Sequence, residues 1–235
     1  LPGSSLVLGA VDLSFDSDYV PRLRLEDVRL LKSGGEALLT LPEVRLALQG
    51  AALLSGEARL SSLRISGARL AAARDRAGRL DFSLGGGGFS PQLGSFADLF
   101  DMADRVLAAP ELKGLTRIEA EALTLTLSDQ RTGRRFVLGD GRLTIENRPD
   151  ALAAELAVTM QGACDRTGRA VVQVVSDKAA PKARLAVEFR NIEAADLAAQ
   201  APLLAPLGSL EAAITGRLAA GLSDQGIETL EGTLD

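Results

Sequence analysis

The amino-acid sequence alternates between apolar and polar residues with a period of two along most of its length. Successive side chains of a β-strand point to opposite faces of a sheet, so this pattern predicts strands with one buried face. Short turn sequences rich in Gly, Asp and Arg separate the alternating runs, and few helical periods lie between them. This spacing favours consecutive antiparallel hairpins over βαβ crossovers. We therefore expect a mostly β protein built on an antiparallel sheet.

The alternation slips by one residue inside several of the expected strands. Either an extra residue forms a β-bulge, or two short strands meet at a kink; both bend the chain. We therefore expect an elongated and strongly curved sheet. The slips separate Leu23 and Leu25 from Val28 and Leu30, Ala58 and Leu60 from Leu63 and Ile65, and Ile118 and Ala120 from Leu123 and Leu125.

Two segments break the β pattern. An amphipathic helix is expected near 91–109, after a Gly-rich linker at 85–88, because Phe96, Phe100, Ala103 and Leu107 fall on one helical stripe. We expect this stripe to lie on the concave face of the sheet and to plug one end of a groove. A shorter helix is expected near 193–204. The chain then divides into a curved β segment (1–84), a linker and helix (85–110) and a continuing β segment (111–235).

The composition removes several kinds of chemistry. The chain has no His and no Trp and a single Cys, so it offers no His-based triad, no His-ligated metal and no internal disulfide. The four glycines at 85–88 lack the ordered spacing of a phosphate-binding loop. With a net charge of −5, nothing favours binding to a nucleic acid. We expect no catalytic residues, no metal and no cofactor, and hence a protein that is not an enzyme.

Arginines recur at alternate strand positions that would face away from the apolar side. One interpretation is a solvated outer face, and another is a surface that meets phospholipid head groups. The first residue is Leu rather than Met, and the last residues resemble half of a strand pair, so we expect a fragment of a longer protein. The arginines concerned are Arg22, Arg24, Arg29, Arg45, Arg59, Arg64 and Arg69.

Several stretches resemble the amino-terminal region of the AsmA-like superfamily (AsmA, TamB and YhdP type) of bridge-like lipid transfer proteins. Residues 35–48, 52–60, 63–70 and 74–82 follow its order of Leu-rich strands and Gly turns, and 183–226 is similar to its strand, short helix and Gly-x-Leu arrangement. The resemblance implies a taco-shaped β-groove with an apolar interior. It also implies a periplasmic location in a Gram-negative envelope, with tethering to the inner membrane by an anchor outside this sequence.

The first functional hypothesis is non-enzymatic binding and transfer of phospholipid, or another acyl-chain lipid, along the groove between inner and outer membranes. The alternative is a structural or assembly factor for outer-membrane proteins that acts by β-strand addition. Neither requires a catalytic group. The residues expected to line the lipid groove are Leu23, Leu25, Val28, Leu30, Leu60, Leu63, Ile65, Leu123, Leu125 and Leu127.

Overall fold

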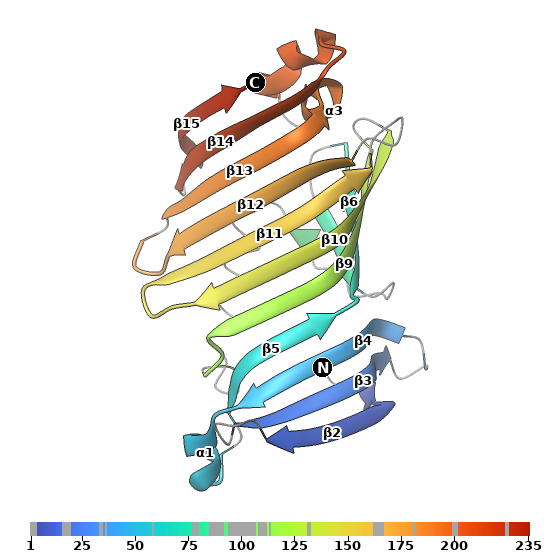
Figure 1. Ribbon diagram of the computed structural model, residues 1–235, viewed down its shortest axis with the longest axis vertical. Coiled ribbons are helices and arrows are strands. Elements are labelled where there is room, and N and C mark those ends of the chain that lie inside the picture. The colour runs from blue at the N-terminus through green and yellow to red at the C-terminus, as the bar shows by residue number, and fades with distance from the viewer. Residues whose placement is uncertain are drawn as a thin grey trace.

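The computed structural model describes residues 4–15, 20–32, 35, 37–57, 59–76, 80–84, 92–93, 107, 112, 114–130, 133–161, 167–180, 182–198, 202–223 and 226–235. Within them the chain is mostly β-strand, and the strands form one large open sheet whose long axis runs across the strands (Figure 1). The order along the sheet is β1-β3-β4-β5-β9-β10-β11-β12-β13-β14-β15, with β2 beside β3.

The first half of the chain supplies the two long strands β3 and β4 and several shorter ones. Its elements are β1 (Ser4–Val7), β2 (Ala10–Phe15), β3 (Pro21–Lys32), β4 (Ala37–Leu48), α1 (Gly50–Leu54), β5 (Leu60–Ser66), β6 (Arg69–Arg74), β7 (Leu80–Leu84) and β8 (Gln92–Leu93).

The second half forms a run of long hairpins. Its elements are β9 (Arg117–Asp129), β10 (Arg134–Asn147), β11 (Ala151–Gln161), β12 (Thr167–Asp177), β13 (Lys182–Glu193), α3 (Ala194–Ala198), the 3-10 helix η2 (Pro202–Ser209), β14 (Ala213–Ser223) and β15 (Gly226–Leu234).

The sheet is mixed, so the prediction of a purely antiparallel sheet is wrong at one place. β9 runs parallel to both β5 and β6, through pairs such as Leu63 with Ile118 and Leu70 with Leu125. Parallel neighbours need a long connection, and the chain between β6 and β9 supplies one. All the other strand pairs are antiparallel, as expected from consecutive hairpins.

The sheet forks at Gly67, where β5 ends and β6 begins. Both strands pair with the same edge of β9, but β5 pairs on its other side with β4, whereas β6 pairs with β7. Gly67 has φ +75°, a conformation that side chains rarely adopt, and an added Cβ would lie 3.2 Å from Cγ of Pro42. β6 lies behind β9 and β10 in the view of Figure 1. The strands β6, β7 and β8 therefore form a smaller branch of the sheet beyond the fork.

The slips in the alternation fall within continuous strands. Asp27 in β3 and Ala122 in β9 have positive φ values of 49° and 51°, each between the two apolar pairs that the slip separates. β5 and β9 have β-bulges here, because the register shifts at Ser61 against β4 and at Ala122 against β10. In β3 no residue is extra, because Glu26 pairs with Glu43 and Val28 with Leu41, so the chain kinks at Asp27 without a bulge.

Helices contribute less than the sequence predicts. Gln92 and Leu93 form strand β8 on the edge of β7, so a helix beginning at Pro91 is wrong for these residues; β8 satisfies backbone groups that β7 would leave unpaired. Leu107 is helical, while Phe96, Phe100, Ala103, the linker at 85–88 and Cys164 lie outside the described residues.

Near 193–204, the structure has the five-residue α3 and then η2 instead of one helix. Glu193 is the last residue of β13, and η2 runs on to Ser209. Pro202 has no N–H to donate to a preceding turn, which accounts for the break of a regular α-helix at this point.

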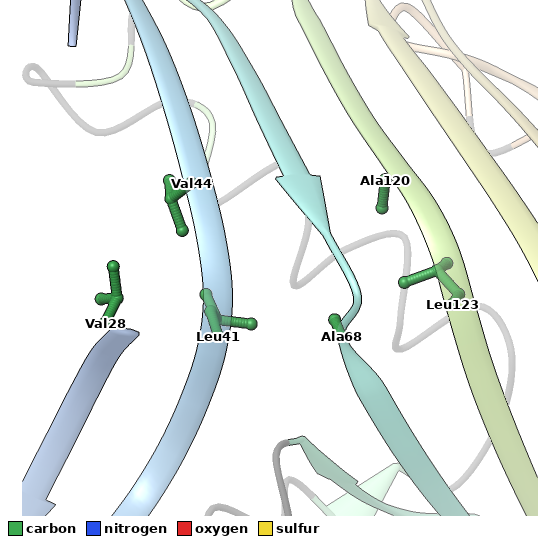
Figure 2. Packing of buried hydrophobic residues seen from close by; sticks show 6 residues of the cluster. All are labelled: Val28, Leu41, Val44, Ala68, Ala120 and Leu123. Atoms are coloured by element: carbon green, nitrogen blue, oxygen red, sulfur yellow. The ribbon is translucent and has the colours of Figure 1, made fainter. Parts of the chain in front are cut away.

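The largest buried cluster lies where the sheet bends (Figure 2). It draws on β3, β4, β9 and the fork, and its buried members sit beside Asp27 and Ala122, two residues of positive φ. We call it the central cluster; its buried residues are Val28, Leu41, Val44, Ala68, Ala120 and Leu123.

Candidate functional site

One face of the sheet carries apolar residues in register from one end to the other. Following the paired positions from β2 to β15 gives a line of eleven residues, all of them apolar or Gly. At a strand spacing of about 4.8 Å, ten spacings span about 48 Å. We name it the Val11 row: Val11, Leu25, Val44, Ile65, Ala120, Leu143, Leu156, Val172, Val187, Leu218 and Gly232.

A second line lies beside the first, two residues away along each strand, and it is apolar throughout. Because side chains two residues apart point to the same side of a strand, the two rows share one face, which we call the inner face. The Leu13 row is Leu13, Leu23, Leu46, Leu63, Ile118, Ile145, Ala154, Val174, Leu185, Ala220 and Leu230.

The residues between these rows point to the opposite, outer face, and most of them are polar. The corresponding line there contains three arginines in succession on β3, β4 and β5, and it becomes less charged toward β14. This Arg24 row is Asp12, Arg24, Arg45, Arg64, Glu119, Thr144, Glu155, Gln173, Ala186, Ala219 and Glu231.

The residues predicted to line the groove occupy strand positions of the inner face, but with different exposure. Leu23, Leu25, Leu63 and Ile65 belong to the two rows and are half-buried. Leu123, by contrast, is only 3% exposed and belongs to the central cluster, so this side chain forms part of a closed core.

The other predicted groove residues lie outside the rows. Leu30, Leu60, Leu125 and Leu127 are half-buried and pair with further apolar residues, and Val28 is buried in the central cluster. The structure thus brings most of them to one face and shows that two are core residues.

The apolar inner face continues over strands that the predicted groove residues do not include. Val172, Val174, Leu185 and Val187 of β12 and β13 lie in the two rows, as do Leu143 and Ile145 of β10. Their period-two spacing was visible in the sequence. What the sequence lacked was the register that aligns them with the Leu-rich strands of the first half.

Two smaller clusters pack on the inner face near strand ends. Leu107 and Leu115 pack with Leu152 against Leu63 and Ile145, so the segment before β9 covers part of the Leu13 row. Among the four residues predicted to form a plug, Leu107 is the one described, and it is 6% exposed.

The second of these clusters is formed where β13 leads into α3. Phe189, Ile192, Ala194 and Ile214 are buried there, and Leu207 of η2 packs against them. This packing places the α3 and η2 segment beside the β12–β14 part of the inner face, near α3 in Figure 1. The inner face is therefore bounded at two strand-end regions by apolar segments of the same chain.

Carboxylates that each accept from two arginines hold the outer face together. Glu43 accepts from Nε of Arg24 at 2.8 Å and lies 2.8 Å from Nε of Arg45. Glu119 accepts from Nε of Arg64 at 2.9 Å and from Nε of Arg117 at 2.6 Å. These pairs join β3 to β4 and β5 to β9 across the strand register.

The same contacts set the acid–base behaviour of the outer face. The hydrogen bond from Arg24 lowers the pKa of the Glu43 carboxyl, and the hydrogen bond from Arg64 lowers that of Glu119. Farther along, the hydrogen bond from Arg148 lowers the pKa of Glu146. All three carboxylates are therefore charged at neutral pH.

One ion pair lies at the inner edge of the fork. Arg74 of β6 donates from Nε to Oδ1 of Asp129 at 3.1 Å and makes a second contact through Nη2. The Asp129 side chain has no exposed surface, and Arg74 is largely covered as well. This buried pair closes the β6 and β9 ladder at its end.

All seven arginines singled out in the sequence are exposed. Those in the Arg24 row have glutamate partners, which agrees with a solvated outer face, and the head-group interpretation is taken up below. Among the residues that the structure describes, no cluster of three or more metal-ligating side chains was found. In the same part of the chain, no helix combines the length and apolarity that crossing a membrane requires.

No protein-family model matches the chain, and no curated protein matches it.

Proposed function

We propose that the protein binds acyl-chain lipid on the inner face of the sheet and transfers it along that face without catalysis. The observation that carries this proposal is the unbroken register of the Val11 and Leu13 rows across eleven strands. An ordinary folded core needs apolar residues on one face, but it does not need them aligned in two lines that reach both ends of an open sheet.

The energetics favour an acyl chain as the occupant. Each methylene group removed from water contributes about 0.8 kcal/mol, and a long-chain lipid has many of them. The rows offer Leu, Val, Ile and Ala side chains with no charged residue among them, so an acyl chain along either row meets no charge. Val44 and Ala120 of the Val11 row are buried in the central cluster, and Leu107 and Leu115 pack against the Leu13 row, so passage of a chain along the whole face requires this packing to open.

The resemblance to the AsmA-like superfamily supports the same proposal and extends it. By analogy with that superfamily, the lipid would be a phospholipid, and transfer would run through the periplasm between the inner and outer membranes of a Gram-negative envelope. This cellular location rests on the sequence resemblance, whereas the lipid-binding face rests on the register of the rows.

The alternative, an assembly factor that acts by strand addition, has one observation in its favour. β15 is the last strand of the sheet order and pairs with β14 along one edge, and no other described strand pairs with its second edge, which could therefore accept a further strand. Binding of an extended peptide by β15 would not require the inner face, so the two functions can be separated.

Equilibrium binding of a fluorescent long-chain fatty acid tests the first proposal. Val172→Glu places a charge in the Val11 row at a half-buried site, and the adjacent Gln173→Glu places the same charge on the outer face of the same strand. We expect Val172→Glu to weaken binding about tenfold or more, because acyl chains avoid a buried charge, and Gln173→Glu to leave it unchanged. Absence of binding by the wild-type protein, or equal loss in both folded variants, would contradict the proposal.

A further inference from the structure

Two arginines face each other on the outer side of the C-terminal region. Arg169 of β12 and Arg190 of β13 occupy directly paired positions, and both are exposed. Like charges at such positions repel each other, because their Cβ atoms lie only about 5 Å apart. Among the residues that the structure describes, neither guanidinium has a carboxylate within ion-pair distance or a hydrogen-bond partner. This part of the chain therefore holds two positive charges together without pairing either of them.

The outer-face arginines of the first half differ in this respect. Arg24 and Arg45 share the carboxylate of Glu43, at 2.6 Å and 2.8 Å, and Arg64 pairs with Glu119. Their charges are compensated within the protein, so a solvated outer face explains these arginines without contact with phospholipid head groups. The pair on β12 and β13 needs a different explanation.

A β-bulge sets the position of Arg190. The register shifts between Phe189 and Ile192, so Arg190 and Asn191 both lie opposite Thr215 of β14. Asn191 has φ +55°, and its backbone N–H donates to Oγ1 of Thr215 at 3.4 Å. Bulges are common next to functional sites, where they re-aim a side chain. This bulge places Thr215, an exposed residue, next to the arginine pair.

Contacts on both faces hold the bulge in place. Nδ2 of Asn191 donates to the carbonyl oxygen of Thr167 at 2.9 Å. A Cβ at Gly168 would lie 3.0 Å from the carbonyl oxygen of Asn191, so a larger residue would crowd the bulge. On the inner face, Phe189 and Ile192 are 1% and 5% exposed. The backbone that carries the arginine is thus ordered before a ligand binds, which lowers the entropy cost of binding.

Other charged side chains surround the pair without neutralising it. Glu188, on the same strand as one of the two arginines, lies 3.6 Å from Nε of Arg217 on β14. Asp140 of β10 and Asp235, which follows β15, are each two strands from the nearer arginine, a separation of about 10 Å. Three arginines against one glutamate leave this patch positively charged.

These features match the chemistry of phosphate. A guanidinium group donates in a planar fork that fits two phosphate oxygens, and two such groups can bind one phosphate. Oγ1 of Thr215 accepts from Asn191, so its own O–H remains able to donate. A dianion between Arg169 and Arg190 would also remove the repulsion between them.

The position of the pair favours a water-soluble ligand. On the inner face at this level, Ala170 and Phe189 pair directly and pack in the cluster to which Leu207 of η2 contributes. The sheet itself therefore separates the arginines from the inner face. The phosphate of a lipid whose acyl chain lies in the apolar rows would be on the other side of the sheet.

We propose that Arg169, Arg190 and Thr215 form a binding site on the outer face for the phosphate group of a small water-soluble ligand. The site uses no residue of the Val11 or Leu13 row and lies on the opposite face of the sheet. It is therefore independent of the proposed lipid binding, and either can fail without the other.

Titration with inorganic phosphate at constant ionic strength, followed by ³¹P NMR, tests the site. Arg169→Gln and Arg190→Gln should each weaken phosphate binding about tenfold or more, because each removes charge-assisted hydrogen bonds. Arg184→Gln is the matched control, since Arg184 is exposed on the same face of β13 but lies opposite Val175 and Gly221. It should leave the affinity unchanged. Circular dichroism of each variant keeps the comparison on folded protein.

Thermal unfolding gives a second readout, in which one variant has effects of opposite sign. In dilute chloride buffer, Arg190→Gln should raise the unfolding temperature by about 1–3 °C, because it removes the repulsion. Phosphate at the same ionic strength should raise the unfolding temperature of the wild-type protein and not that of Arg190→Gln. Arg184→Gln should respond to phosphate as the wild-type protein does.

Three outcomes would overturn the proposal. The first is that the wild-type protein does not bind inorganic phosphate. The second is an equal loss of affinity in Arg184→Gln, which would mean a general attraction of anions to the outer face. The third is that Arg169→Gln and Arg190→Gln weaken binding to phosphatidylglycerol vesicles but leave binding of inorganic phosphate unchanged, since the ligand would then be a lipid head group.

Discussion

The strands β3–β5 and the strands β12–β14 have the same kind of inner face and different outer faces. In both regions the paired inner residues are apolar, as in Leu23 with Leu46 and Val172 with Val187. On the outer face, the first region has Arg24, Arg45 and Arg64 in succession, whereas the second has Gln173, Ala186 and Ala219 at the same level of the sheet. The apolar residues of the inner face thus persist although the residues of the outer face change. We therefore expect lipid binding to involve the inner face along the whole sheet.

The two regions also differ in how they are closed. The central cluster packs within the sheet at its bend, beside the positive-φ residues Asp27 and Ala122, whereas α3 and η2 pack against Phe189 in the C-terminal region. In the first region the apolar side chains are buried by the bend of the sheet itself, and in the second they are buried by a short helical segment. The apolar pattern continues from one region to the next, although Val44 and Ala120 of the Val11 row are buried in the central cluster.

The largest expected effects come from emptying the two clusters. Phe189→Ala should lower the free energy of unfolding by about 3–5 kcal/mol, and Leu123→Ala by about 2–5 kcal/mol, because both side chains are almost fully buried. Denaturant unfolding measures both. Val175→Ala, at an exposed site of β12, is the control and should cost much less.

The same pair of variants shows whether the regions unfold together. If the continuous sheet makes one cooperative unit, each variant shifts a single calorimetric transition. Two transitions, each shifted by one variant alone, would instead mean that the N-terminal and C-terminal regions are separate units joined by a common strand order.

The buried ion pair at the fork should give the next largest effect. Arg74→Ala leaves the Asp129 carboxylate buried without its Arg74 partner, and we expect a loss of about 3 kcal/mol of stability. The double variant Arg74→Met with Asp129→Leu should cost clearly less than the single variant. A double variant as unstable as Arg74→Ala would show that packing around the fork, not charge burial, sets the cost.

The bulge in β9 offers a smaller change of opposite sign. Ala122 has φ +51°, which costs an L-residue about 1 kcal/mol or more, so Ala122→Gly should stabilise the protein by about 1 kcal/mol. Ala120, two residues earlier in the same strand, should show the opposite result when replaced by Gly. Thermal unfolding of the two variants compares them, and destabilisation by Ala122→Gly would contradict the bulge geometry.

The smallest expected effect is the pH dependence of the outer face. The pKa values of Glu43 and Glu119 are lowered from their ordinary 4.5, so their contribution to stability is present above that value. It is lost as the pH falls through the lowered pKa values. Because both carboxylates still reach solvent, the loss should be small and should shrink in high salt; an equal loss at all salt concentrations would contradict this origin.

The alternation of residues was enough to predict the β class. Leu25 and Val28 are three residues apart, and two apolar positions at that spacing share a face of one strand only if a residue between them, such as Asp27, leaves the regular strand conformation. Asp tolerates the left-handed conformation that this requires. The local pattern therefore contained the irregularities of the strands.

The parallel pairing of β9 with β5 and β6 was not predictable in the same way. Strand order depends on where the chain returns after β6. Nothing in the local sequence around Leu63 or Ile118 indicates that these two residues pair. Without that order, Val172 and Leu185 could not be placed in line with Leu23. The sequence thus predicted which kinds of residue form the candidate site and that they share one face. How many strands the site spans became clear only from the strand register of the structure.

The central claim is that lipid lies along the inner face in both regions, and site-specific photocrosslinking tests it most directly. A photoreactive amino acid would replace Leu23 or Leu185 on the inner face, with Arg22 and Ala186, their neighbours on the outer face, as matched positions. After incubation with phospholipid vesicles and illumination, mass spectrometry should detect lipid adducts at Leu23 and Leu185, and few at Arg22 and Ala186. Equal adducts on both faces, or none at Leu185, would contradict a lipid path that runs along the whole sheet.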